Sequence, residues 1–297
     1  MTELDTVVLT DPSSTLTATF VPAAGMIGTS LRDGDVEFLG QRRGLSAYLS
    51  DAKTMGIPLL YPWANRLSAN TYDVDSAVVT LTPGTGGVRT DPNGAPMHGT
   101  LAAYPGWLVT DVSANTLTAA VDFSRPELLA SFPFPHVLTQ HVTLADRRLS
   151  VETTVRPTSA AAVPRCFGYH PYVTIPGVPR QDWILQTPSM RHLAVDERGL
   201  PTGEHEPWSA SGPLGDTFFD DGFDQVPEGA QFILRGGNHT ITVTFEKGYA
   251  AAQIFAPPTD ALVAIEPMAA PTDALRRGGY PVAAGSPAVH RFSITVS

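Results

Sequence analysis

The feature that most constrains this chain is a period-two alternation of apolar and polar residues, which recurs from one end to the other. Successive side chains of an extended strand point to opposite faces, so this alternation is typical of strands with one buried face. The alternating runs are Leu16–Val21, Val137–Leu144, Leu149–Val155, Thr240–Phe245 and Phe292–Val296, with shorter β-branched runs at Ala77–Leu81 and Leu117–Phe123. The pattern predicts a chain built mainly from β-strands.

Turn residues separate these runs, and helical patterns are scarce. The 26 glycines and 27 prolines fall mostly between the alternating segments. Asp91–Gly94 and Arg235–Asn238 are turn signals, because Pro presets φ and Gly or Asn accepts a positive φ. No window of about twelve residues keeps a helical apolar stripe free of Gly and Pro. Many short strands joined by turns indicate an all-β sandwich or barrel.

We expect one continuous domain over residues 1–297, with enough hydrophobic content (42%) to bury a large core. The stretch Val195–Gly215 is rich in Pro, Gly and Ser and resembles a linker. Candidate site residues lie on both sides of it, so a long ordered loop within one domain is the better interpretation.

Composition excludes several classes of protein. A net charge of −10 and a pI of about 5.2 argue against nucleic acid or anionic lipid as a partner. No apolar run approaches the ~20 residues of a membrane span, and the acidic segment Met1–Thr6 lacks the pattern of a signal peptide. The single cysteine, Cys166, rules out an intrachain disulfide and is expected to be a buried, inert thiol. These features favour a soluble, cytoplasmic protein.

Two short strings carry the groups best suited to proton transfer. His170 lies in Phe167–Tyr172, a run with aromatic neighbours that can form one wall of a ligand site, and Pro171 favours an extended backbone at the histidine. Glu266 lies in the apolar run Val263–Met268, where a carboxylate is costly unless it is paired or lies at the mouth of a pocket. A histidine and a glutamate in such settings suit general acid–base catalysis.

Two further strings supply polar side chains. Arg66 ends Pro62–Arg66, and its planar guanidinium is a fork of donors suited to the oxygen atoms of a ligand. His98 precedes Gly99, which lets the backbone turn and expose the imidazole.

Taken together in their order along the chain, the four strings resemble the aldose 1-epimerase (galactose mutarotase) family. The resemblance extends from about Thr15 to Val296. Asp220–Phe223 resembles the Asp-x-x-Phe of that family, with Asp221 as an alternative to Asp220. The resemblance implies a large two-sheet antiparallel β-sandwich, the galactose mutarotase-like supersandwich.

The resemblance also implies a mechanism without a cofactor. Glu266 as a carboxylate removes the proton of the sugar O1 hydroxyl, and protonated His170 gives a proton to the ring oxygen O5. The open-chain aldehyde rotates about C1–C2 and closes on the other face. His98 and Arg66 bind near O5, and Asp220 orients distal hydroxyls. The expected partner is a small aldose, and the chain is expected to be a monomer or a weak homodimer.

Other ligands and functions are weighed against this interpretation. The sequence contains no His-x-His, His-Glu-x-x-His, EF-hand, Gly-x-Gly-x-x-Gly or P-loop pattern, so neither a metal nor a nucleotide is expected. One alternative is a non-catalytic sugar-binding module or sensor. Another is a hexose-6-phosphate 1-epimerase, whose phosphate would require a cationic clamp such as Arg42–Arg43 or Arg276–Arg277. We expect these arginines to be solvated loop residues.

Overall fold

The computed structural model describes residues 4–51, 53–74 and 77–297, and within them strands dominate. The largest sheet has nine strands in the order β18 (Ser211–Pro213), β15 (Ile184–Gln186), β20 (Ala230–Gly236), β21 (His239–Lys247), β25 (Ala288–Val296), β11 (Arg148–Pro157), β10 (His136–Ala145), β9 (Thr116–Asp122) and β8 (Leu108–Val112). The pairs along it are antiparallel. The all-β prediction is therefore confirmed.

A second sheet lies against the first. Its order is β17 (Pro201–Trp208), β16 (Met190–Val195), β19 (Phe219–Asp224), β22 (Ala251–Ala256), β23 (Val263–Met268), β13 (Gly168–Tyr169) and β5 (Leu59–Leu60), with β14 (Tyr172–Val173) also paired to β23. Tyr169 shows how the two sheets meet. Its ring lies 5.0 Å from that of Phe292 on β25, and its hydroxyl bonds Thr153 on β11 at 2.6 Å.

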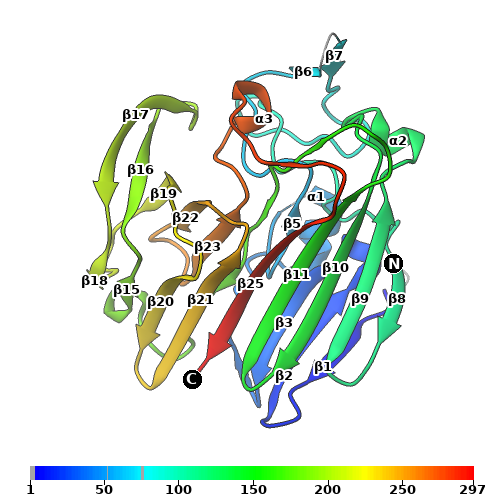
Figure 1. Cartoon of the computed structure of the whole chain (residues 1–297). Coiled ribbons are helices and arrows are strands. Elements are labelled where there is room, and N and C mark those ends of the chain that lie inside the picture. The colour runs from blue at the N-terminus through cyan, green and yellow to red at the C-terminus, as the bar shows by residue number, and fades with distance from the viewer. Residues whose placement is uncertain (1–3, 52, 75–76) are drawn as a thin grey trace.

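Smaller sheets complete the fold (Figure 1). A four-stranded sheet of β1 (Val7–Thr10), β2 (Leu16–Val21), β3 (Ile27–Asp33) and β4 (Val36–Glu37) lies behind β9–β11. Two two-stranded sheets pair β6 (Thr71–Val74) with β7 (Ala77–Thr80) and β12 (Val163–Pro164) with β24 (Val282–Ala283). The helices are short: α1 (Gly44–Asp51), α2 (Pro126–Leu129), α3 (Ala274–Arg277) and the 3₁₀ turns η1 (Pro22–Ala24) and η2 (Arg180–Asp182). α1, α2, α3 and β6–β7 gather at one end of the sheets, at the top of Figure 1.

The alternation read from the sequence becomes a buried face in the structure. Along β10 and β11 every second residue is buried, and the register pairs Leu138 with Val155 and Val142 with Val151 on that face. By contrast, β23 is buried at every position, because one side faces the core and the other is covered by loops. Ile265 belongs to the main core, whereas its neighbour Glu266 points to the opposite side of the sheet.

One prediction needs correction. The stretch Val195–Gly215 is not a long loop, because it contains the strands β17 and β18. β17 is an edge strand whose residues are largely exposed, so it lacks the alternation that would have revealed it. Pro207 is tolerated there because an edge strand can spare a backbone donor.

Among the described residues, none of the helices is long and apolar enough to cross a membrane. Met1–Glu3, part of the segment in which a signal peptide was sought, lie outside the described residues.

Candidate active site

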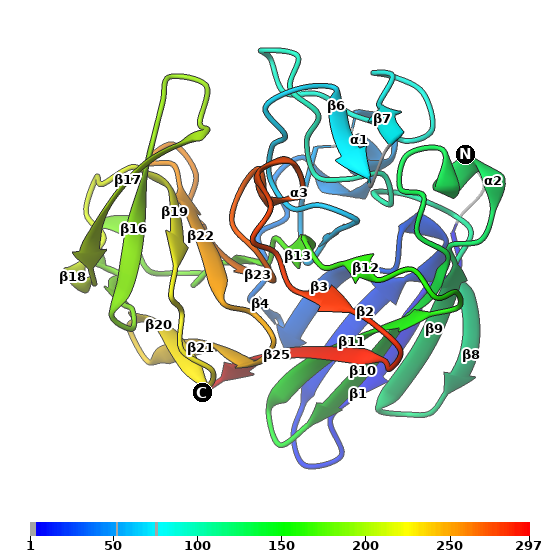
Figure 2. The same ribbon diagram turned by 45° about the horizontal axis from the view of Figure 1, so that its top comes forward.

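A cavity of about 130 Å³ collects the site residues named from the sequence, with Asp220 and not its alternative Asp221 in the lining. It opens on the side of the second sheet that faces away from the core, where β19, β22, β23 and β13 run side by side (Figure 2). The lining side chains are Arg42, Thr54, Asn65, Arg66, Met97, His98, His170, Tyr172, Asp220, Phe255 and Glu266. They come from widely separated parts of the sequence, so the fold itself assembles the cavity.

Strand register explains why the sheet residues meet. β22 pairs with β23 so that Gln253 lies opposite Glu266, and with β19 so that Phe255 lies opposite Asp220. Tyr172 on β14 lies opposite Ala264, two residues before Glu266 on the same face of β23. Cross-strand neighbours share a face, so the carboxylates and the aromatic wall are presented to one side.

Two loops bring the remaining residues to this face. Asn65 and His98 both have positive φ, and the His98 amide donates to the Asn65 carbonyl at 2.8 Å. Gly99 lies against the backbone of Tyr61, where a Cβ atom would stand 2.0 Å from the Tyr61 oxygen. Only glycine permits this approach, so it keeps the loops of Arg66 and His98 side by side.

His170 and Glu266 form a buried pair. His170 Nε2 lies 3.1 Å from Glu266 Oε1, and the residues are 6% and 1% exposed. Burial, together with the charge of Asp220, raises the pKa of Glu266 well above its ordinary value. Burial, together with His98 and Arg42, holds the pKa of His170 well below its ordinary value. In the free site these shifts favour a neutral pair that shares one proton, which differs from the expected resting carboxylate and imidazolium.

The polar side chains around the pair are themselves oriented. Arg66 donates from Nε to Asp91 Oδ2 at 3.0 Å and from Nη1 to Asn65 Oδ1 at 3.1 Å, which fixes the plane of its guanidinium. Burial and the charges of Arg66 and Arg89 lower the pKa of His98 to about 3, so its imidazole is neutral. His98 can therefore exchange hydrogen bonds with a ligand without carrying charge.

The structure separates Asp220 from Asp221. Asp220 faces the cavity and accepts a hydrogen bond from Gln253 Nε2 at 2.8 Å. Asp221 faces the other way and contacts His192 Nε2 at 3.0 Å. The geometry favours Asp220 as the site aspartate.

Sequence reasoning named Tyr172 only as one of the aromatic neighbours of His170, and it missed Thr54 and Phe255. Tyr172 stacks on His170, with ring centroids 4.3 Å apart, and its hydroxyl contacts Thr54 Oγ1 at 2.7 Å. Arg42 is an exposed turn residue, as expected, but its guanidinium also lies over the rings of Tyr172 and Phe255 and lines the cavity. A tyrosine two residues from the histidine was a visible signal for Tyr172. No local pattern marks Thr54 or Phe255.

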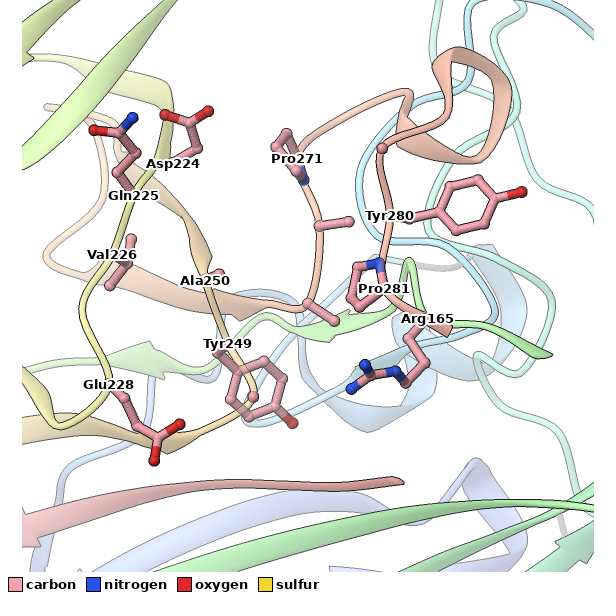
Figure 3. A pocket seen from close by; sticks show the side chains of 14 residues that line it. Arg165, Asp224, Gln225, Val226, Glu228, Tyr249, Ala250, Pro271, Tyr280 and Pro281 are labelled. Atoms are coloured by element: carbon pink, nitrogen blue, oxygen red, sulfur yellow. The ribbon is translucent and has the colours of Figure 1, made fainter. Parts of the chain in front are cut away.

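Two other features do not provide comparable chemistry. Cys166 is buried away from the cavity and desolvation raises its pKa, as expected for an inert thiol. A larger cavity of about 700 Å³ has Gln225 and Glu228 on one side and Arg165 and Tyr280 on the other (Figure 3). Its lining includes no histidine and no paired acid and base, so the smaller cavity is the better candidate.

The sequence matches known proteins over long stretches. Residues 6–295 match the model of the family described as aldose 1-epimerase. The chain is 28% identical over 150 residues to the uncharacterized protein YihR of Escherichia coli (strain K12), a match that spans 50% of this chain and 45% of that relative.

Solved structures show the same fold. A galactose mutarotase related enzyme from Lactobacillus acidophilus has a TM-score of 0.80 at 16% identity, covering 99% of this chain and 97% of that one. The GalM/aldose epimerase homologue from C. elegans has a TM-score of 0.77 at 18% identity, covering 99% of both chains. Since the family match runs over nearly the whole sequence, this chain belongs to the aldose 1-epimerase family.

Proposed function

We propose that this protein is an aldose 1-epimerase that interconverts the α and β anomers of a free aldohexose without a cofactor. The observation that carries the proposal is the contact between His170 Nε2 and Glu266 Oε1, at 3.1 Å, inside a cavity of about 130 Å³. A cavity of this size suits a small ligand better than a chain of sugars. Family membership supports the reaction type.

The pair supplies the two proton transfers that anomerisation requires. Glu266 takes the O1 proton while His170 gives a proton to O5, the C1–O5 bond breaks and the aldehyde forms. Rotation about C1–C2 and the reverse transfers give the other anomer, so the pair starts and ends with one proton. Hydroxyl groups of the entering sugar stabilise the charged form of the pair by hydrogen bonding, which offsets the desolvation that favours the neutral form. Each transfer contributes about 10²–10⁴-fold.

The neighbouring side chains hold the sugar. Arg66, fixed by Asp91 and Asn65, directs its remaining donors to the ring oxygen and adjacent hydroxyls. His98 lies with its ring centroid 5.7 Å from that of His170 and contacts the same region. Asp220, held by Gln253, accepts hydrogen bonds from distal hydroxyls.

The proposal also covers location and partners. A small aldose is the ligand, and a cytoplasmic, monomeric or weakly dimeric protein without a nucleic-acid or membrane partner remains the expectation from the sequence. The location and the absence of a nucleic-acid or membrane partner are proposed from composition, and the aldose ligand is proposed from the family.

The test is exchange between anomers measured by NMR over a panel of free aldoses, before and after exhaustive chelation with EDTA. We expect exchange faster than the spontaneous rate for at least one aldose, and the same rate after chelation. Binding of sugars without faster exchange would favour a non-catalytic module. Loss of activity that one divalent ion restores would contradict the cofactor-free mechanism.

One observation favours a second candidate, an aldose 6-phosphate as substrate. Arg42 lies at the cavity, where a cation can meet an anionic substituent. However, Arg42 already faces Asp260, with Nη2 3.4 Å from Oδ2, and Arg277 is paired with Asp273. One arginine with a carboxylate partner is a poor phosphate clamp. We therefore expect kcat/KM to be higher for free aldoses, and a value at least about tenfold higher for the 6-phosphate would favour the second candidate.

A further inference from the structure

Tyr172 contacts His170 of the proposed acid–base pair with both its ring and its hydroxyl. Its ring stacks on the imidazole of His170 at a centroid distance of 4.3 Å and an interplanar angle of 24°. Its hydroxyl lies 3.3 Å from His170 Nε2, the same nitrogen that faces Glu266. The ring therefore restricts the imidazole plane, and the hydroxyl touches the atom that exchanges the proton.

The hydroxyl of Tyr172 is itself held from two sides. Thr54 Oγ1 lies 2.7 Å away, and Arg42 donates from Nη1 at 3.2 Å. A phenol has one donor and two acceptor lone pairs. When Thr54 and Arg42 both donate, the tyrosine proton can point at His170 Nε2 while this nitrogen is unprotonated, and every hydrogen-bonding position of the hydroxyl is then filled.

We propose that Tyr172 is a positioning residue for His170, held in place by Thr54 and Arg42. This inference rests on the proposed function, because it assigns His170 a role in proton transfer. Arg42 precedes α1 in the sequence and Thr54 follows it. Both side chains line the cavity, and both hold the hydroxyl of the tyrosine that stacks on His170. A donor at Nε2 favours the unprotonated ring, and so it makes protonated His170 a stronger acid toward O5.

Several charged or titratable groups face His170 besides the tyrosine. Burial raises the pKa of Tyr172 to about 12, so its hydroxyl keeps its proton over the working pH range. The other groups around the cavity are Glu266 on β23, Asp220 on β19, and Arg42, Arg66 and His98 from the loops. Tyr172→Phe leaves all of them in place and keeps the stacked ring, so it isolates the hydroxyl.

Tyr172→Phe is expected to lower kcat by about fivefold to tenfold with little change in KM, the effect of one lost hydrogen bond to a reacting group. The limb of the pH profile that belongs to the His170–Glu266 pair should move to higher pH by about half a unit. Thr54→Val should give a smaller change in the same direction. If the Tyr172→Phe protein does not fold, kcat and the pH profile of Thr54→Val test the inference in its place.

The matched control is Tyr169→Phe, which also removes a buried tyrosine hydroxyl but one that bonds Thr153 in the core. Its pH profile should match that of the wild type. An unchanged kcat and pH profile in Tyr172→Phe, or an equal change in Tyr169→Phe, would overturn the inference.

A readout independent of turnover separates this inference from the proposed function. The imidazole signal of His170, assigned by its loss in His170→Asn, is followed by NMR against pH in the free proteins. We expect its titration to lie at higher pH in Tyr172→Phe than in the wild type. An identical titration would overturn the inference, even if the wild type proves to be an active epimerase. A shifted titration in a protein that turns over no aldose would support the positioning contact and contradict the proposed function.

Discussion

At the scale of single residues, the candidate site keeps ionisable groups in surroundings that disfavour their charges. Glu266 is buried on a strand whose every residue is buried, and the pKa shifts of Glu266 and His170 share burial as their largest cause. Such an arrangement costs stability and is common where a group must exchange protons near neutral pH. Ionisation of Glu266 should therefore lower the stability of the folded protein.

The first prediction concerns Glu266→Gln and stability. Below the ordinary pKa of a glutamate, near pH 4, both folded and unfolded chains carry a protonated Glu266. As pH rises, the unfolded chain ionises while the raised pKa resists ionisation in the fold, so wild-type stability falls relative to the Gln variant. Thermal unfolding should show the variant equal to the wild type at acid pH and increasingly more stable above it.

A control distinguishes this effect from a general loss of charge. Glu152 on β11 pairs with Arg291 on β25 and is partly exposed. Glu152→Gln should therefore show no comparable gain in stability over the wild type as pH rises. A Glu266→Gln protein that is less stable than the wild type at neutral pH would show that the carboxylate is stabilised by contacts in the fold.

The second prediction concerns Arg66. Arg66→Lys keeps the charge but loses the planar fork that Asp91 and Asn65 hold, so kcat/KM should fall by about tenfold or more with the fold intact. Arg147→Lys is the matched control, since Arg147 also bonds an aspartate, Asp33, but lies outside the cavity. Wild-type kinetics in Arg66→Lys would place this arginine outside the site.

At the scale of elements, alternation along strands decides which side chains meet. Asp220 and Asp221 are neighbours in sequence, and β19 directs one to the cavity and the other to His192. The sequence contained both alternatives, but choosing between them required knowing which side of β19 faces the cavity. That depends on sheet register, which is set by long-range pairing.

The third prediction uses this pair of neighbours. Asp220→Asn should lower kcat/KM by about tenfold or more, because a charged acceptor for sugar hydroxyls is lost. It should also lower the pKa of Glu266, since Asp220 contributes to the upward shift. The limb of the pH profile that reports the pair should therefore move to lower pH. Asp221→Asn should stay within about twofold of the wild type, and the reverse ranking would assign the site to Asp221.

Element prediction succeeded where burial is one-sided and failed where it is not. The alternating runs at β2, β10, β11, β21 and β25 were recognised because each has one buried face. The edge strand β17 is exposed on both faces and carries no such signal. The eight-residue α1 is shorter than the window that a helical stripe needs, and so the wall contributed by Arg42 and Thr54 was not foreseen.

At the scale of the whole molecule, the last strand joins the two halves of the largest sheet. β25 lies between β21 and β11, and thereby connects β18, β15, β20 and β21 to β11, β10, β9 and β8. The fold class could be predicted from alternation and from the resemblance. This order of strands could not, because it depends on pairings between distant segments.

The fourth prediction follows from that connection. One domain over residues 1–297 stays a prediction, and it implies that the two halves lose structure together. Far-UV circular dichroism and tryptophan fluorescence, to which the buried Trp63 and Trp183 contribute, should report coincident thermal transitions. Two separated transitions would show that the halves are independent units.

The central claim is that Glu266 and His170 exchange protons with an aldose, and the fifth prediction tests it through Glu266→Gln. This variant keeps the shape and most of the hydrogen bonding of the side chain but cannot take a proton from O1. On an aldose that the wild type converts, kcat should fall by about 10²-fold or more while sugar binding changes far less. Adding His170→Asn should lower kcat little further, because the two groups act as a unit.

The most direct measurement is therefore the NMR exchange rate between anomers for wild type, Glu266→Gln and the control Glu152→Gln, each shown to be folded. We expect Glu152→Gln to match the wild type and exchange with Glu266→Gln to fall by about 10²-fold or more. A folded Glu266→Gln protein whose exchange rate stays within about threefold of the wild type would contradict the assignment of Glu266 as the base.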